Sequence, residues 1–224
     1  MFKLDMHVHT DETSECGKIK AEKVVNLYYQ AGYDGLVITD HYYRRFFVNQ
    51  GDLNWAEKVE NYLAGYYEAQ KVGEELGMNI ILGIELRFLN NINDYLVYGL
   101  TPESLKEYPR LYKLGIKEFS KFAADKDILV YQAHPYRMGM ERVSPDFLDG
   151  VEVYNAKPRH DSRNHLAYQF AQENNLKMVA GSDFHQLNDL GRSGILLSEE
   201  VTNSKELVRL LKREEFELIR PDNS

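Results

Sequence analysis

Short apolar runs alternate with longer segments of helical spacing along the whole chain. In one such segment Val24, Leu27, Tyr28 and Ala31 recur at i, i+3, i+4 and i+7, which predicts a helix, and Gly32 follows as its C-cap. The apolar runs predict strands over residues 2–9, 35–39, 79–86, 95–98, 128–133, 151–154, 177–181 and 194–197. Further helices are expected over residues 55–76, 111–125, 161–174 and 204–213.

Polar residues at the strand ends decide between the two folds that this alternation allows. Strands and helices in alternation indicate parallel strands joined by right-handed crossovers, in an open sheet or in a closed barrel. An open sheet forms its site at one switch point, whereas a barrel gathers all strand C-termini around one mouth. Because one predicted strand after another ends in His, Asp or Glu, we expect an α/β fold of the (β/α) barrel class.

Length, composition and charge set broad limits on the protein class. At 224 residues we expect a single domain over 1–224, with 220–224 as a loose tail. No apolar stretch resembles a signal peptide or a membrane span, so we expect a cytoplasmic protein with no membrane partner. The net charge of −8 disfavours long nucleic acid but leaves a small anionic substrate open. The single cysteine, Cys16, is interpreted as a half-buried small side chain, because its sequence neighbours are not basic.

A cluster of metal-binding side chains is the main chemical signal. Asp5, His7 and His9 lie two residues apart in the first strand and therefore point to the same side, towards the barrel interior. Later strands end in Thr39-Asp40-His41, Gly83-Ile84-Glu85, Ala133-His134-Pro135 and Ser182-Asp183-Phe184-His185. Five of the seven histidines of the chain therefore follow apolar runs. Imidazole and carboxylate together suit Zn²⁺, Mn²⁺ or Fe²⁺, and buried charges of this kind are costly unless paired or metal-bound.

These motifs, in this order, resemble those of the polymerase and histidinol phosphatase (PHP) family, over residues 3 to about 198. The resemblance implies a distorted (β/α)7 TIM-like barrel, two to three divalent metal ions and hydrolysis of phosphate esters. It implies that one metal is bound by His7, His9, Glu85 and Asp183, a second by Glu85 and His134, and a third by His41 and His185. Two positions depart from the family pattern. Glu12 or Glu15 is open as the ligand after the His-x-His pair, with Glu15 preferred, and Asp94 stands where many members have a histidine on the fourth strand.

Residues in the loops after the strands are candidates for substrate contact and proton transfer. Arg137, three residues after His134, is expected to clamp a phosphate. Asn155, at the end of a strand, is a candidate to contact the substrate, and His160 a candidate proton donor. We interpret Lys157, Arg159 and Arg192 as solvated loop charges. Asp5 and Asp40 are placed to accept hydrogen bonds from ligating histidines, with a plain structural role equally open for each.

The leading hypothesis is hydrolysis of a small phosphate monoester or diester by a metal-activated water. The substrate is expected to be a small phosphorylated molecule, with a nucleotide or a short oligonucleotide end left open. One alternative is an amidohydrolase-like enzyme that cleaves a C–N bond, although Glu85 stands where that chemistry often uses a carboxylated lysine. Another is a non-catalytic metal-binding accessory domain.

Overall fold

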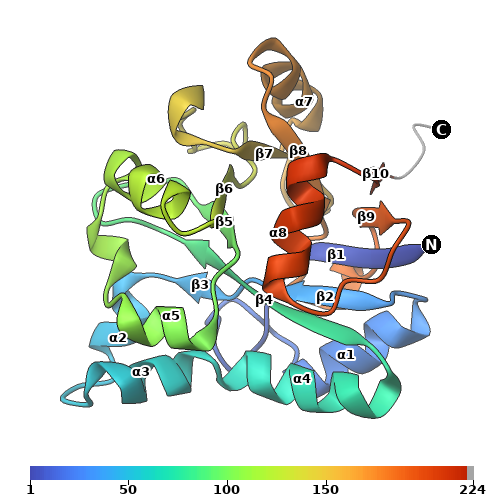
Figure 1. Ribbon diagram of the computed structural model, residues 1–224. Helices are drawn as coiled ribbons and strands as arrows, with labels where there is room; N and C mark the ends of the chain where they lie inside the picture. The colour runs from blue at the N-terminus through green and yellow to red at the C-terminus, as the bar shows by residue number, and fades with distance from the viewer. Residues whose placement is uncertain (221–224) are drawn as a thin grey trace.

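A computed structural model describes residues 1–220, so the expected loose tail lies almost wholly outside the described residues. Its ten strands within that range form one sheet that curls into a nearly closed barrel (Figure 1). The strands are β1 (Phe2–Val8), β2 (Gly35–Ile38), β3 (His41–Tyr42), β4 (Asn79–Leu86), β5 (Tyr95–Tyr98), β6 (Leu129–Gln132), β7 (Gly150–Asn155), β8 (Lys177–Gly181), β9 (Gly194–Leu197) and β10 (Phe216–Ile219). The predicted barrel is therefore confirmed, and the strands over residues 79–86, 95–98, 177–181 and 194–197 have the predicted bounds.

Seven strands make up the ring of the barrel. They follow the order β1-β2-β4-β5-β6-β7-β8. A parallel bridge between Val8, at the end of β1, and Phe184, just after β8, joins the last strand of the ring to the first. The expectation that all strands run parallel is wrong for β5, which is antiparallel to both β4 and β6. Only eight residues, 87–94, separate β4 from β5, too few for a helical crossover, so the chain returns directly beside the strand it left. The strand β9 pairs antiparallel with the other edge of β1 and extends the sheet outside the ring.

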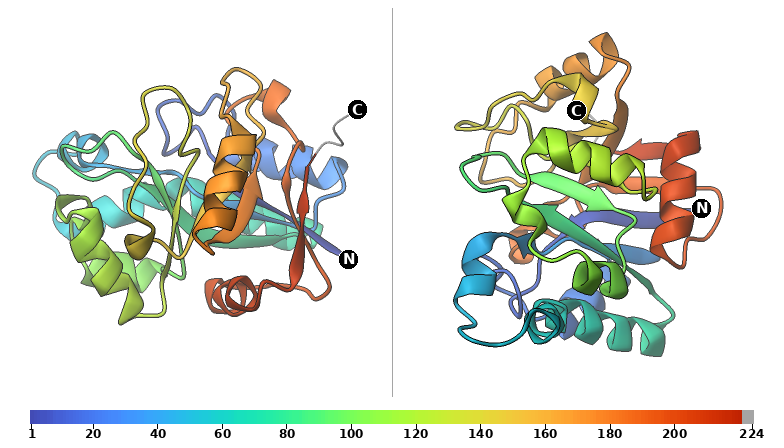
Figure 2. Two further views of the ribbon diagram at one scale, coloured as in Figure 1. Left: turned by 90° about the horizontal axis from the view of Figure 1, so that it is seen from above. Right: turned by 60° about the vertical axis from the view of Figure 1, so that its left-hand side comes forward.

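The helices surround this sheet on its outer face (Figures 1 and 2). They are α1 (Ala21–Gln30), α2 (Arg44–Val48), α3 (Trp55–Tyr62), α4 (Ala64–Leu76), α5 (Pro102–Glu107), α6 (Ile116–Ala124), α7 (Asn164–Glu173) and α8 (Ser204–Arg213). The helix expected over 55–76 is two helices that meet at Leu63, and the helix expected over 111–125 begins only at residue 116, after a 3-10 turn at Leu111–Lys113. Gly32 has φ of 73°, the left-handed conformation of the C-cap predicted for the first helix.

Apolar packing fixes the barrel and leaves its mouth for polar groups. The helices α1 and α4 bury Val24, Tyr28 and Ala69 against β1 and β2. The helix α8 buries Leu207 and Leu211 in a separate cluster with residues from the beginnings of β1 and β6. That cluster lies at the end of the barrel where β6 begins, opposite the strand C-termini. Among residues 1–220, no helix has both the length and the apolar character needed to cross a bilayer.

Candidate metal centre

Four side chains predicted as metal ligands converge at the mouth of the barrel from three strand ends. His7 lies in β1 and His9 just after it, Glu85 lies near the end of β4, and Asp183 follows β8. His7 Nε2 and His9 Nε2 are 3.0 Å apart. The nearer carboxylate oxygens of Glu85 and Asp183 lie 3.3 to 3.7 Å from these two nitrogens. A tetrahedral ion with bonds of about 2.1 Å keeps its ligand atoms ~3.4 Å apart, so Glu85 and Asp183 are each spaced from His7 and His9 as ligands of one metal would be.

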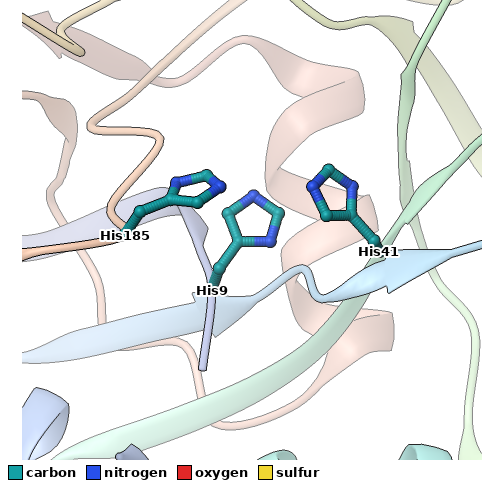
Figure 3. Close-up of side chains that lie close together, drawn as sticks. All are labelled: His9, His41 and His185. Carbon is teal, nitrogen blue, oxygen red and sulfur yellow. The ribbon is translucent and has the colours of Figure 1, made fainter. Parts of the chain in front are cut away.

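Two further groups of ligands adjoin the first. His134 Nε2 lies 3.2 Å from Glu85 Oε1, so Glu85 is shared between His7 and His134 as a bridging carboxylate would be. On the other side, ring nitrogens of His9, His41 and His185 lie within 4.8 Å of one another. Figure 3 shows these three rings coming from separate strand ends and pointing towards one another. The structure thus brings together the seven side chains from which the resemblance implied three metal sites.

Two of these ligands have a backbone conformation that is unfavourable for their residue types. His134 has φ of 31° and Asp183 has φ of 49°, and neither is a glycine. Such conformations cost about 1–3 kcal/mol each and persist where surrounding structure over-determines them, most often at functional sites. Each residue directly follows a barrel strand, and the left-handed turn lets the chain leave the strand while its side chain remains in the mouth.

Unpartnered buried atoms indicate that the cluster is built to hold an ion. Glu85 Oε2 and His134 Nδ1 are buried and have no hydrogen-bond partner among residues 1–220. Glu85 Oε2 does lie 2.8 Å from His41 Nδ1, but without the direction of a hydrogen bond. Buried polar atoms are almost always bonded, so such exceptions point to a missing ion or water.

The carboxylates in the cluster are in the charged form that metal binding requires. Burial by itself would raise the pKa of Glu85, but His41 and His7 hold it well below its usual value. Burial opposes ionisation of Asp183 as well, and the charges of His7 and Lys157 outweigh it, so that its pKa is also well below the usual range. In the absence of metal, neighbouring cations therefore balance these buried charges.

Glu152, not one of the predicted aspartates, orients the ring of His7. Its Oε1 lies 2.8 Å from His7 Nδ1, and its Oε2 accepts the backbone N–H of His134 at 2.9 Å. Such a carboxylate fixes which ring nitrogen is available to a metal. Asp5 instead accepts hydrogen bonds from the Tyr28 hydroxyl and the Ser182 N–H. Asp5 therefore has the structural role left open for it, because its oxygens accept from Tyr28 and from the backbone N–H groups of His7 and Ser182 rather than from a histidine ring.

Asp40 reaches a ligand only through an intermediate hydroxyl. It accepts hydrogen bonds from Ser14 Oγ at 2.6 Å and from the N–H and hydroxyl of Thr10. Ser14 Oγ in turn lies 3.2 Å from His9 Nδ1. Gly65 of α4 packs so closely that a Cβ there would lie 2.0 Å from Thr10 Oγ1, which ties the helix to this network. Asp40 thus orients His9 indirectly.

The acidic candidates at the two positions that depart from the family pattern all have other partners. Glu15 is half-exposed and lies 3.2 Å from Arg45, so the preference for Glu15 as a ligand is not supported by its position. Glu12 accepts the N–H of Ala21, the first residue of α1, and caps that helix. Both side chains point away from the histidine cluster, because the loop after His9 folds back on α1. Asp94 does lie beside His41 and Glu85, but both its oxygens accept hydrogen bonds from the Arg87 guanidinium at 2.6 Å.

A rim of cations covers the ligand cluster. Arg137 follows His134 in a turn closed by its N–H to the His134 carbonyl, and its Nη2 donates to Asp183 Oδ2 at 2.7 Å. Lys157 is 8% exposed, and its Nζ lies 3.1 Å from both Asp183 Oδ1 and His185 Nδ1. The interpretation of Lys157 as a solvated loop charge is therefore wrong. The burial of the segment after β7 turns its side chain inward, and residue spacing alone does not reveal this.

Three other predicted loop residues have partners of different kinds. Asn155 Oδ1 accepts from Arg137, and its Nδ2 donates to Glu152 and Asp183, so its amide is fully used in positioning these side chains. Arg159 pairs with the buried Asp189, which corrects its interpretation as a solvated charge. Arg192 is bonded through Nε to the carbonyl of Asn188.

Five of the seven predicted ligands line one cavity of about 350 Å³ together with the cations, whereas His7 and His9 are fully buried. Its walls include five cationic side chains, from Lys18, Arg87, Arg137, Lys157 and Arg159. His160 also lines it, and partial burial together with the charges of Arg137 and Lys157 lowers the pKa of its imidazole. A lowered pKa reduces the protonated fraction of His160 at neutral pH.

Cys16 also lines this cavity, next to the histidines. Its Sγ lies 3.0 Å from His185 Nε2. Burial would raise the pKa of the thiol, but hydrogen bonding to His185 and His41 lowers it to about 6. The interpretation of Cys16 as a thiol without basic neighbours is therefore wrong. The neighbours are 25 and 169 positions away in the sequence and become adjacent only in the barrel.

Comparison with known proteins gives one family match and several fold matches. The PHP domain family matches residues 5–217. No curated protein sequence matches the chain. Among solved structures, a two-domain protein from Bacteroides vulgatus that contains a predicted PHP-like metal-dependent phosphoesterase aligns with a TM-score of 0.72 and 18% identity, covering 98% of this chain and 64% of that one. The chain thus spans less than two thirds of that protein.

Two other solved structures share the fold. PsfC from Pseudomonas syringae aligns with a TM-score of 0.68 and 15% identity, over 99% of this chain and 92% of that one. An amidohydrolase from Chromobacterium violaceum, with bound sulfate and no metal, aligns with a TM-score of 0.58 and 14% identity, over 99% of both chains. At these identities the likeness describes the fold alone.

Proposed function

The chain belongs to the PHP domain family, and from this premise and the geometry of its metal centre we propose that it hydrolyses a small phosphate monoester or diester. Two or three divalent ions are the proposed cofactors. His7, His9, Glu85 and Asp183 would hold one, Glu85 and His134 a second, and His41 and His185 a third. When bound, such ions act as Lewis acids and lower the pKa of water, so that a nucleophile forms near neutral pH.

The observation that carries this proposal is the group of cationic side chains beside the predicted ligands. The cavity is lined by Lys18, Arg87, Arg137, Lys157 and Arg159, of which Arg87 and Arg159 are paired with Asp94 and Asp189, in a protein whose net charge is −8. Local positive charge in an acidic protein is suited to a small anion and not to long nucleic acid, which contacts an extended basic surface. A phosphate ester is an anion of this size.

Arg137 is the side chain best placed to bind the phosphoryl group. Only its Nη2 is engaged, with Asp183 and Asn155, while its buried Nε has no partner among residues 1–220. A guanidinium presents several donors in a fixed plane that matches phosphate oxygens. If Asp183 turns its oxygens to a metal, Arg137 and Lys157 become available to the phosphate.

The other residues of the rim position these groups. Asn155 forms hydrogen bonds with both Arg137 and Asp183 and so fixes their relative positions. The ion pair between Arg159 and Asp189 fixes the loop after β7 against the loop after β8. His160, at the cavity wall, is proposed as the group that exchanges a proton with the leaving group. Zn²⁺, Mn²⁺ and Fe²⁺ all suit the ligand set. A nucleotide or a short oligonucleotide end fits the same requirements as other small phosphate esters.

An amidohydrolase-type reaction is the second candidate, supported by the fold likeness to the Chromobacterium violaceum protein. Similar ligands can activate water against a C–N bond. The strand end that would carry a bridging carboxylated lysine has Glu85 instead, and the buried Lys157 contacts Asp183 as a cation. The cationic cavity favours an anionic substrate, so we rank phosphate ester hydrolysis first.

Hydrolysis of matched chromogenic substrates separates these candidates. The protein would be loaded with Mn²⁺ or Zn²⁺ and tested on p-nitrophenyl phosphate, bis-p-nitrophenyl phosphate and p-nitroacetanilide. We expect turnover of one or both esters and none of the anilide, and the preferred ester distinguishes a monoesterase from a diesterase. Turnover of the anilide alone would support the amidohydrolase reading. Bound metal without any turnover would support an accessory domain.

A further inference from the structure

The proposed metal site at His41 and His185 needs a further ligand, and the sulfur of Cys16 lies beside these histidines. The proposed third metal is held by His41 and His185, and two side chains are too few for a stable structural or catalytic ion. The loop after His9 was expected to supply the missing ligand through Glu12 or Glu15, but both carboxylates turn away to Ala21 and Arg45. Two residues of that loop line the cavity, Cys16 and Lys18, and the thiol of Cys16 is the metal-binding side chain of the two.

The position of Cys16 is that of a ligand and not of a packing residue. Its Sγ lies 3.0 Å from His185 Nε2, a polar contact between two atoms that can each bind a metal, and shorter than apolar packing allows. His41 and His185 line the same cavity as the sulfur. The cysteine is therefore part of a cluster with histidines from two other strand ends.

An independent feature of the same place points to a cation. Glu85 Oε2 is buried, has no hydrogen-bond partner among residues 1–220, and lies 2.8 Å from His41 Nδ1 and 3.3 Å from His9 Nε2. It is thus directed into the group formed by His9, His41 and His185. A buried carboxylate oxygen left without a donor beside histidine nitrogens is the arrangement expected around a metal position.

We propose that Cys16 is a ligand of the metal at His41 and His185, so that this position is a mixed cysteine and histidine site. This rests on the proposed metal-dependent function. On binding, the thiol releases its proton to water and one sulfur–metal bond forms, with no change of oxidation state. Thiolate ligands favour zinc over manganese or magnesium, so the third position is expected to select Zn²⁺ more strongly than the other two.

Cobalt spectroscopy tests this directly, because Co²⁺ replaces zinc and reports its ligands. Cys16 is the single cysteine of the chain, so any thiolate-to-cobalt charge-transfer band of the wild-type protein must come from it. We expect such a band in the near ultraviolet on addition of Co²⁺ to metal-free protein, together with visible d–d bands. Cys16→Ser should lose the charge-transfer band, keep the d–d bands, and bind the last cobalt at least ~10-fold more weakly.

A matched control uses the other sulfur of the cavity wall. Met140→Leu removes the thioether of Met140 and should leave the charge-transfer band unchanged. Cobalt d–d bands without a charge-transfer band in the wild type would overturn the role of Cys16 while leaving the proposed function intact. Failure of the wild type to bind cobalt or zinc at all would overturn both. Since the wild-type spectrum is decisive alone, the test does not depend on the stability of Cys16→Ser.

Discussion

The ligand cluster and the cationic rim share one cavity but are built in different ways. The cluster comes from strands and the residues directly after them, where the pleat of β1 and β4 fixes which side chains face inward. The rim comes mainly from the loops after β6 and β7, which carry Arg137, Lys157 and Arg159. Rigid strands suit metal ligands, whose spacing must hold within a few tenths of an ångström, whereas loops can vary with the substrate.

Removal of both first-strand histidines should break the cluster and have the largest effect. His7→Ala with His9→Ala takes away two of the four ligands of the first metal, and we expect loss of that metal and a fall in kcat of at least ~10³-fold, since Lewis-acid stabilisation is worth several kcal/mol. Metal content by mass spectrometry and ester hydrolysis are the measurements. His165→Ala, an exposed histidine outside the cluster, is the control. Unchanged metal content in the double variant would show that the first-strand assignment is wrong.

Loss of the rim arginine should affect the substrate and leave the metals in place. Arg137→Ala is expected to lower kcat/KM for a phosphate ester about 10²-fold while metal content stays constant, and Arg137→Lys should recover part of the loss. The control is Arg209→Ala, whose partner Glu199 lies on the surface. If kcat and KM were both unaltered in Arg137→Ala, the phosphate clamp would have to be abandoned.

The link between ring orientation and metal affinity can be tested at Glu152. Glu152→Gln keeps the shape of the side chain but weakens its hold on His7 Nδ1, and we expect metal affinity to fall by about 10–100-fold. Competition with a chelator dye gives the affinity, and Glu199→Gln on the surface serves as comparison. Equal affinities of Glu152→Gln and the wild type would mean that Glu152 has only a structural role.

The smallest effect is expected at the two outward-facing acids. Glu15→Gln and Glu12→Gln should both keep the full metal content, because their carboxylates are engaged with Arg45 and with the first turn of α1. A loss of about 0.5–1 kcal/mol in the free energy of unfolding is expected for Glu12→Gln alone, from the weakened helix cap. Metal analysis and urea unfolding distinguish the two effects, and a metal lost by Glu15→Gln would restore it as a ligand in place of Cys16.

The contrast between strand residues and loop residues also explains which parts of the site could be predicted from the sequence. The clustering of seven side chains at the mouth was predictable because ionisable residues that follow apolar runs lie at the strand ends of a barrel, whereas their assignment to metal sites came from the resemblance to the PHP family. The antiparallel direction of β5 was missed, although the eight residues between the predicted strands 79–86 and 95–98 are too few for a helical crossover. Glu152 was missed although Val151-Glu152-Val153 places a charge within a buried strand, a signal that residue spacing does contain.

Side chains from loops were less predictable than those from strands. Lys157 and Cys16 have neighbours that come close only after the barrel closes, and no local pattern distinguishes them from solvent-exposed residues. Arg137 was found because it is three residues from a ligand, a distance that one turn spans.

The central claim, that this barrel mouth is a metal centre for hydrolysis, is tested most directly by metal removal and return. The purified protein would be analysed for metal, treated with EDTA, assayed on p-nitrophenyl phosphate and bis-p-nitrophenyl phosphate, and then reloaded with Mn²⁺ or Zn²⁺. We predict two or three divalent ions per chain, loss of turnover on chelation and its recovery on reloading. A protein that takes up no metal, or that hydrolyses the esters equally well after the metal is removed, would contradict the claim.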